Sequence, residues 1–72
     1  MVGNEVKVQL TRRETQVVRL LARGRTYVQV ADELGMSANT VGTHVKNAYL
    51  KLDVHNAASA VVRAIQLGLI EV

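Results

Sequence analysis

The sequence predicts one all-α domain of four helices, two of which form a tight helix-turn-helix. The chain has 72 residues, which suffices for a single domain. It contains no proline and only two aromatic residues, so helices are favoured over a sheet, although its many valines favour strands slightly. Side chains that cap helices also precede stripes of apolar residues at helical spacing. We assign residues 10–72 to this domain and residues 1–9, whose periodicity is weak, to an N-terminal arm or linker remnant.

Two capping boxes mark the first two helices. In the first, the Thr11 hydroxyl and the Glu14 carboxylate can each bond the other residue's backbone N–H, and Gly24 ends the helix. In the second, Thr26 and Gln29 have the same relation, and Gly35 ends a short helix at about Leu34. The apolar residues expected on the inner faces are Leu10, Val17, Val18 and Leu21, then Tyr27, Val30, Ala31 and Leu34.

The third and fourth helices begin at Ser37 and Asn56, which are both good N-cap residues. A connector of residues 53–55 separates the two helices, and Gly68 closes the fourth after Leu67. The third helix is expected to bury Val41, Val45, Ala48, Tyr49 and Leu52.

The fourth helix is apolar on nearly every side, with only Ser59, Arg63 and Gln66 as a polar stripe. Such a helix is covered on two sides, either because it is enclosed by its own domain or because it pairs with a second copy. A core of this size rarely supplies more than about 3–5 kcal/mol of net stability. There is no cysteine for a disulfide, and the two histidines lack metal-ligand spacing. We therefore expect a homodimer, formed through Ala58, Val62 and Ile65.

The turn between the second and third helices favours a function in binding DNA. Ala31 allows the helices to approach closely, and Gly35 permits a sharp turn four residues later. An ordinary corner between two helices has the same features, so the turn alone does not decide. The third helix gives further support. Its side opposite the apolar stripe presents Asn39, Thr43, Lys46 and Leu50, with Gly42 and Asn47 at the margins.

These side chains suit the major groove, where amide, hydroxyl and ammonium groups meet base edges. No acid occurs in this helix before Asp53, and carboxylates would be repelled by phosphate. An ordinary solvated helix face is the alternative. The residues expected to contact bases are Asn39, Gly42, Thr43 and Lys46. The residues expected to contact phosphates are Thr26, Tyr27, Ser37, Thr40 and Asn47.

Charge and composition agree with an anionic partner without requiring one. The formal charge is +3, and five arginines crowd residues 12–25. The arginines that could flank a duplex are Arg12, Arg13, Arg23 and Arg25. For His44 we favour packing or hydrogen bonding between helices, and we assign His55 no role.

Other classes of function find no support in the sequence. It contains no nucleophile elbow, phosphate loop, metal cluster or paired carboxylates, so we expect neither an enzyme nor a cofactor. No apolar run approaches the roughly 20 residues of a membrane span, and no signal peptide is visible. We expect a cytoplasmic protein that binds no membrane and, within these residues, no small molecule.

The order of these residues resembles the LuxR-type DNA-binding domain, also called the LuxR/NarL/GerE class. Residues 10–14 are similar to its opening Leu-Thr-x-Arg-Glu, and the segment from Ser37 to Val45, followed by Lys51 and Leu52, is similar to its most specific part. Gly24, Val30, Ala31 and Leu34 follow at matching spacing.

The resemblance implies a third helix that reads the major groove and a fourth that forms a dimer. It places Gly42, Thr43 and Lys46 where relatives contact bases, and Thr26 and Thr40 near phosphate contacts. Family members often have lysine where this chain has Gly42, and arginine where it has Ala57. The first departure puts one DNA contact in doubt, and the second a stabilising link between the last two helices.

The expected function is sequence-specific binding of double-stranded DNA in transcription regulation. The chain would be the output domain of a response regulator of the LuxR/NarL type, binding two half-sites as a dimer, with RNA polymerase as a further partner. Two alternatives stay open: a promoter-reading domain of a sigma factor, and a protein-interaction module that uses the fourth helix.

Overall fold

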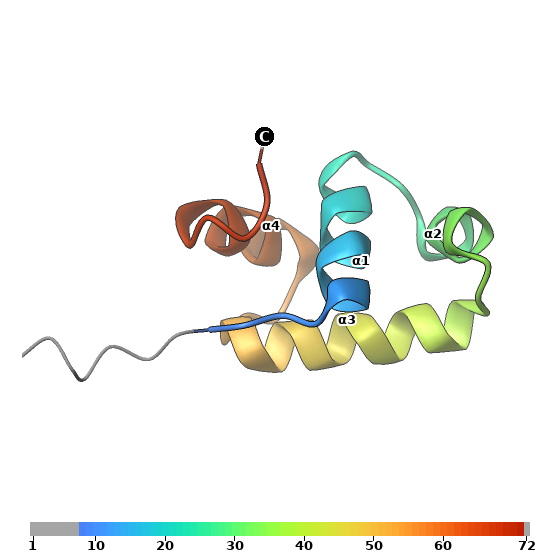
Figure 1. Cartoon of the computed structure of the whole chain (residues 1–72), viewed down its shortest axis with the longest axis horizontal. Helices are drawn as coiled ribbons and strands as arrows, with labels where there is room; N and C mark the ends of the chain where they lie inside the picture. The colour runs from blue at the N-terminus through green and yellow to red at the C-terminus, as the bar shows by residue number, and fades with distance from the viewer. Residues whose placement is uncertain (1–7, 72) are drawn as a thin grey trace, which may run out of the picture.

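The computed structural model describes residues 8–71 and contains four helices in that range (Figure 1). They are α1 (Arg12–Ala22), α2 (Tyr27–Leu34), α3 (Ala38–Leu52) and α4 (Ala57–Gln66). The predicted all-α fold is confirmed. The expected arm at residues 1–9 lies almost wholly outside the described residues, and Val8 is half-buried against the core. No helix in the described range is long and apolar enough to cross a membrane.

Each helix begins at the predicted capping residue. Both capping boxes are formed: Thr11 with Glu14, and Thr26 with Gln29. The Ser37 hydroxyl accepts from the backbone N–H of Thr40 at 3.1 Å, and the Asn56 side chain accepts from that of Ser59 at 2.8 Å. These caps satisfy backbone donors that a short helix otherwise leaves unpaired, so they fix where each helix starts.

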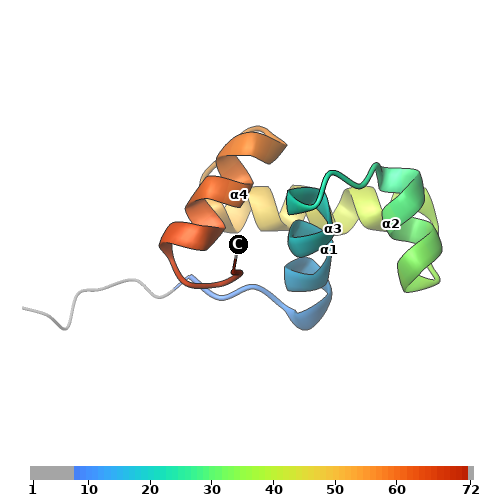
Figure 2. The ribbon, with the colours of Figure 1, turned by 90° about the horizontal axis from the view of Figure 1, so that it is seen from above.

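The turn between α2 and α3 has the predicted geometry. Gly35 adopts a left-handed conformation with φ of 68°, which glycine reaches without steric cost. The N–H of Met36 then bonds to the carbonyl of Ala31 at 3.0 Å, and Ala31 itself is buried. This arrangement places α2 directly against the N-terminal half of α3 (Figure 2).

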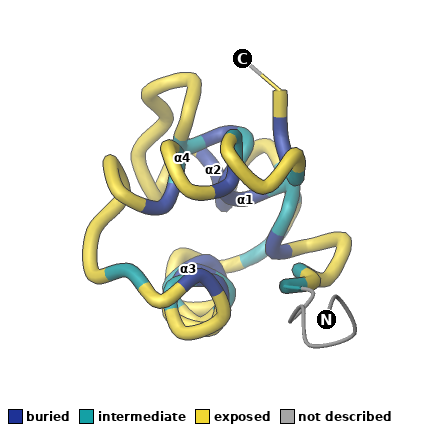
Figure 3. Tube along the Cα trace, turned by 90° about the vertical axis from the view of Figure 1, so that its left-hand side faces the viewer, coloured by how far each residue is buried: buried dark blue, intermediate teal, exposed yellow. Residues whose placement is uncertain are grey.

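The buried side chains form two clusters on either side of α1. One joins α1 and α2 to the first half of α3, and consists of Val17, Leu20, Val30, Ala31, Val41 and Val45. The other joins α1 to the second half of α3, to α4 and to the segment after it, and consists of Val18, Ala48, Leu52, Ala60, Ala64 and Ile70. The long helix α3 thus supports both halves of the domain on one side only, and its other side is open to solvent (Figure 3).

Helix α4 is not enclosed by the domain. It buries only Ala60 and Ala64, whereas Val62 is 56% exposed and Leu67 is 42% exposed. The interpretation of α4 as an embedded central helix is therefore wrong. Helix α4 packs against α1 and α3 from one side only, so its second apolar side faces solvent.

Two polar links hold α3 in place. The Lys51 ammonium lies 2.7 Å from Oε1 of Glu14, whose side chain is almost wholly buried at the start of α1. Burial alone would raise the pKa of Glu14, but the Lys51 hydrogen bond and charge, together with Thr11, hold that pKa below its ordinary value. At the end of α3, Nε of Arg63 donates to the carbonyl of Leu52 at 3.2 Å. This bond links α3 to α4 although Ala57 offers no such link.

Candidate nucleic-acid interface

The solvent side of α3 carries a continuous exposed ridge, which we define as Asn39, Thr43, Lys46 and Leu50 and which is polar except for Leu50. All four side chains are exposed, and at about 100° per residue they fall within one narrow sector of the helix. Val41, Val45, Ala48 and Leu52 occupy the opposite sector and are buried. Figure 3, which views α3 along its axis, shows buried backbone toward the other helices and exposed backbone away from them. The predicted outward direction of Asn39, Thr43 and Lys46 is confirmed.

Hydroxyl groups gather at the N-terminal end of this ridge. The Ser37 and Thr40 hydroxyl oxygens lie 2.9 Å apart, and both residues are exposed. The Thr43 hydroxyl donates to the carbonyl of Asn39 at 3.2 Å, so its oxygen lone pairs face outward. The start of α3 therefore offers short side chains that accept and donate hydrogen bonds.

Gly42 lies in the middle of a helix without a packing reason inside the chain. A Cβ added at this position would have no heavy atom within 4 Å among residues 8–71, apart from the adjoining backbone of its own helix. Glycine within a helix costs about 1 kcal/mol relative to alanine. The absence of a side chain therefore leaves an open notch beside the ridge that the fold itself does not use.

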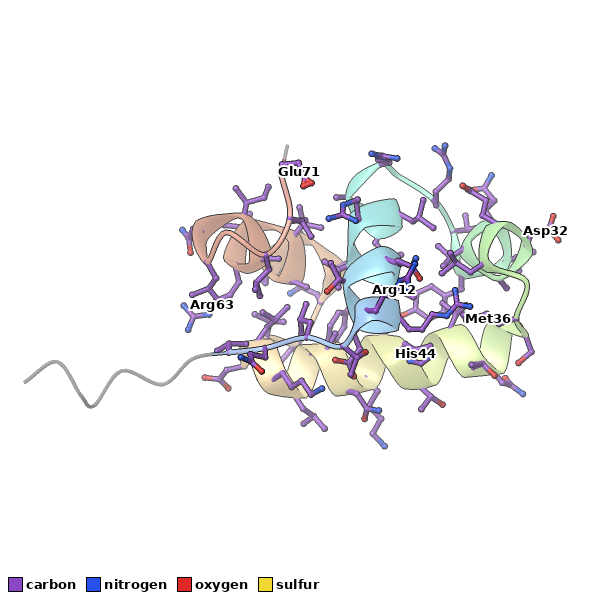
Figure 4. The ribbon with its side chains drawn as sticks, viewed as in Figure 1. Arg12, Asp32, Met36, His44, Arg63 and Glu71 are labelled. Atoms are coloured by element: carbon purple, nitrogen blue, oxygen red, sulfur yellow. The ribbon has the colours of Figure 1, made fainter. Side chains whose placement is uncertain are left out.

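The ridge is positively charged. Within α3 there are two lysines and no carboxylate, and one of the lysines, Lys51, is paired with Glu14. His44 is half-buried on the flank of the helix, which agrees with the packing role expected for it. In Figure 4 the labelled Asp32 extends from α2 away from α3. No carboxylate of the described residues stands among the ridge side chains, so a phosphate backbone would meet no repulsive group there.

A groove of about 300 Å³ runs along one flank of the ridge, from the start of α2 to the connector after α3. Its lining includes Tyr27 of α2, His55 of the connector, and Gly42 and Tyr49 of α3. Partial burial, and then the neighbouring Tyr27, raise the pKa of the Tyr49 phenol, so Tyr49 stays protonated at neutral pH and can donate a hydrogen bond. Because His55 lines the same groove as Lys46 and Leu50, it borders the candidate interface, although the sequence analysis assigned it no role.

The residues predicted to bind phosphates lie at the edges of α2 and α3. Thr26 and Ser37 are the N-caps of these helices, and Tyr27 and Thr40 are exposed in their first turns. Asn47 is exposed at the margin of the ridge. Of these five residues, Thr40 and Asn47 lie on α3 itself, and Tyr27 lines the groove that flanks the ridge.

The four arginines expected to flank a duplex differ in their exposure and in their partners. Arg12 and Arg13 are exposed at the start of α1, where Arg13 bonds to Gln16 at 3.1 Å. Arg25 pairs with Glu33 at 2.8 Å, so its charge is partly neutralised within the domain. Arg23 is exposed at the far end of α1.

The candidate dimer residues lie on the outer side of α4, away from the ridge. Ala58 and Val62 are exposed and border an open groove of about 350 Å³ with Arg63 and Gln66. Ile65 is half-buried and packs partly against the core, so it lies at the margin of this surface.

A model of the family described as "Bacterial regulatory proteins, luxR family" matches residues 8–64. The spore germination protein GerE of Bacillus subtilis is 40% identical over 65 residues, which cover 90% of this chain and 88% of that protein. The transcriptional activator protein AnoR of Acinetobacter nosocomialis is 37% identical over 93% of this chain, but only 28% of AnoR is covered.

Among solved structures, the response regulator ChrA of a heme-sensing two-component system superposes with a TM-score of 0.84 at 35% identity. That match covers 96% of this chain and 34% of the ChrA chain. The chain therefore spans about a third or less of AnoR and ChrA, and nearly all of GerE. The chain belongs to the luxR family of bacterial regulatory proteins, and its described residues form the helix-turn-helix DNA-binding domain of that family.

Proposed function

We propose that this domain recognises a specific DNA sequence by inserting the ridge of α3 into the major groove. The observation that carries the proposal is the joint exposure of Asn39, Thr43 and Lys46 on one side of a helix whose other side is wholly buried. Amide and ammonium groups form bidentate or charge-assisted bonds with purine edges, and hydroxyl groups bond to either base. The notch at Gly42 lets the helix backbone approach the base edges closely.

Phosphate contacts would hold the helix in this position. The Thr26 hydroxyl accepts from a backbone N–H group, so its own hydrogen can be donated to a phosphate oxygen. The Ser37 and Thr40 hydroxyls share one hydrogen bond, so one of their two hydrogens remains for a phosphate oxygen. The side chains of Tyr27, Thr40 and Asn47 are exposed beside them. Contacts of this kind fix the orientation of a protein on the duplex but carry no sequence information.

Two copies would pair through the outer side of α4. Ala58 and Val62 are apolar and exposed, so their burial against a second copy would be favourable. Ile65 extends this surface toward the core. A symmetric pair would place two α3 helices in successive major grooves on one side of the duplex, about 10 bp apart.

The names of two relatives support a proposal about the larger protein in which this domain acts. A transcriptional activator and a response regulator carry similar domains within longer chains. We propose that this domain is the output domain of a response regulator of this type, acting in the cytoplasm, with RNA polymerase as a further partner. The activity resides in binding rather than catalysis.

Selection of duplexes from a random pool tests the proposal directly. An inverted repeat with half-site centres about 10 bp apart is the expected result, and a single unrepeated site would contradict the dimer. Titration of the selected duplex at several salt concentrations should give a slope of log K against log salt of about −0.9 per neutralised phosphate. Undetectable or salt-independent binding would instead favour a protein-interaction module.

A further inference from the structure

One member of the ridge has a chemistry unlike its neighbours. Leu50 is 72% exposed, the largest fraction among the exposed large apolar side chains of the described residues. It follows Lys46 by four residues and Thr43 by seven, so it lies on the same line of the helix. Its hydrocarbon stands at the C-terminal end of a surface that is otherwise polar.

Nothing in the described fold covers this side chain. Both core clusters lie on the opposite side of α3, and Leu50 belongs to neither. The surface continuous with Leu50 is the ridge and its flanking groove, which Leu50 lines together with Gly42 and Lys46. The partner of Leu50 is therefore whatever meets that ridge.

The major groove displays one apolar group on its base edges, the 5-methyl group of thymine. Residues one turn apart on a helix are separated by about 6 Å along its axis, and base pairs are separated by about 3.4 Å. A helix that places Lys46 against one base pair therefore places Leu50 about two base pairs further along.

We propose that Leu50 contacts the 5-methyl group of a thymine about two base pairs from the base pair that Lys46 contacts, and thereby selects thymine at that position. The inference rests on the proposed insertion of the ridge into the major groove. It makes Leu50 a specificity-determining residue beside the polar residues predicted from the sequence.

The test replaces thymine by deoxyuridine, which removes the methyl group and leaves every hydrogen-bonding atom of the base in place. Each thymine of the selected half-site is replaced in turn, symmetrically in both half-sites, and the affinity of the whole chain is measured. One position should weaken binding about fourfold per half-site, which corresponds to the loss of one buried methyl group. If cytosine is placed at that position instead, its replacement by 5-methylcytosine should restore part of the affinity.

The variant Leu50→Ala should abolish the difference between thymine and deoxyuridine at that position. Val28→Ala is the matched control, because Val28 is 69% exposed but lies on α2 away from the ridge. This control should keep the full difference. Both variants should fold, since both side chains are exposed, and circular dichroism checks this.

The outcomes separate the two proposals. If the wild-type chain binds the duplex but shows no position sensitive to the methyl group, or if the sensitivity persists in Leu50→Ala, the role of Leu50 is overturned and DNA recognition stands. If the wild-type chain binds no duplex at all, the proposed function fails and the role of Leu50 fails with it.

Discussion

Helices α3 and α4 bury one side in the same way and expose very different second sides. Each presses small or branched apolar residues against α1, with Ala48 in one and Ala60 and Ala64 in the other. The exposed side of α3 is polar and cationic, whereas that of α4 includes Ala58 and Val62. The buried sides of the two helices explain how the domain folds, but they do not explain what it binds. The exposed sides differ because they face different partners, DNA for α3 and a second copy for α4 under the proposed function.

The largest expected effect comes from placing a charge on α4. Val62→Glu should prevent pairing, and the affinity for the two-site duplex should then fall by about 10²–10⁴-fold, because two linked contacts become one. Affinity for a single half-site should not change. Ala22→Glu adds the same charge at the exposed end of α1 and should leave both affinities nearly intact. Equal losses in the two variants would show that charge alone, rather than a lost dimer, lowers affinity.

A matched pair of substitutions separates the two sides of α3. Leu52 is fully buried, so Leu52→Ala should lower the free energy of unfolding by about 2–5 kcal/mol. Leu50→Ala makes the same chemical change on the exposed side and should alter stability by less than about 0.5 kcal/mol. Urea denaturation followed by circular dichroism measures both. Similar destabilisation by the two substitutions would contradict the division of α3 into a buried and an open side.

Removal of the cation on the ridge should weaken DNA binding without affecting the fold. Lys46→Ala should cost about 1–3 kcal/mol in binding and relax the base preference at one position if Lys46 bonds to guanine. If the contact is to phosphate, the salt slope should instead decrease by about one. Unchanged affinity, base preference and salt dependence would exclude Lys46 from the interface.

Gly42→Ala should move stability and binding in opposite directions. The free energy of unfolding should rise by about 1 kcal/mol, because a Cβ there meets no atom of the chain and the helix gains a better helix former. Affinity for DNA should fall, because the added methyl group fills the notch beside the ridge. A rise in stability with unchanged affinity would show that the duplex does not approach Gly42.

The smallest effect concerns the link between α3 and α1. The pKa of Glu14 lies below its ordinary value of 4.5, so its ionised form stabilises the folded state. This stabilisation is complete above that ordinary value and is lost as the pH falls through the lowered pKa. Stability measured from pH 7 to pH 2 should therefore decline less steeply in Glu14→Gln than in the wild type.

Most of the fold could be predicted because its signals are local. The caps at Thr11, Thr26, Ser37 and Asn56 and the left-handed Gly35 depend on residues within four positions of one another. The ridge of α3 follows from helical spacing alone. The position of α4 could not be decided in this way, because an apolar helix has the same pattern whether it is enclosed or exposed on one side.

The features that sequence reasoning missed join residues far apart in the chain. The pair between Glu14 and Lys51 spans 37 positions, and no local pattern distinguishes Lys51 from a solvated lysine. The burial of Ile70 depends on a turn after α4 that brings it back to the core, and its only signal was an apolar residue after Gly68. His55 lies in the connector after α3, and its place beside the ridge depends on how that connector folds, which no local pattern predicts.

The corner between α3 and α4 connects the geometry of the protein to the spacing of its DNA site. Asp53 takes a left-handed conformation, with φ of 58°, and the bond from Arg63 to the carbonyl of Leu52 fixes the first turns beyond it. In a symmetric pair joined through α4, this corner sets how far apart the two α3 helices stand. Under the proposed function, residues 52–63 would set the number of base pairs between the halves of the operator without contacting any base, and α3 would set the sequence of each half. Substitutions at the corner would then change the preferred spacer length and leave the half-site sequence as it was.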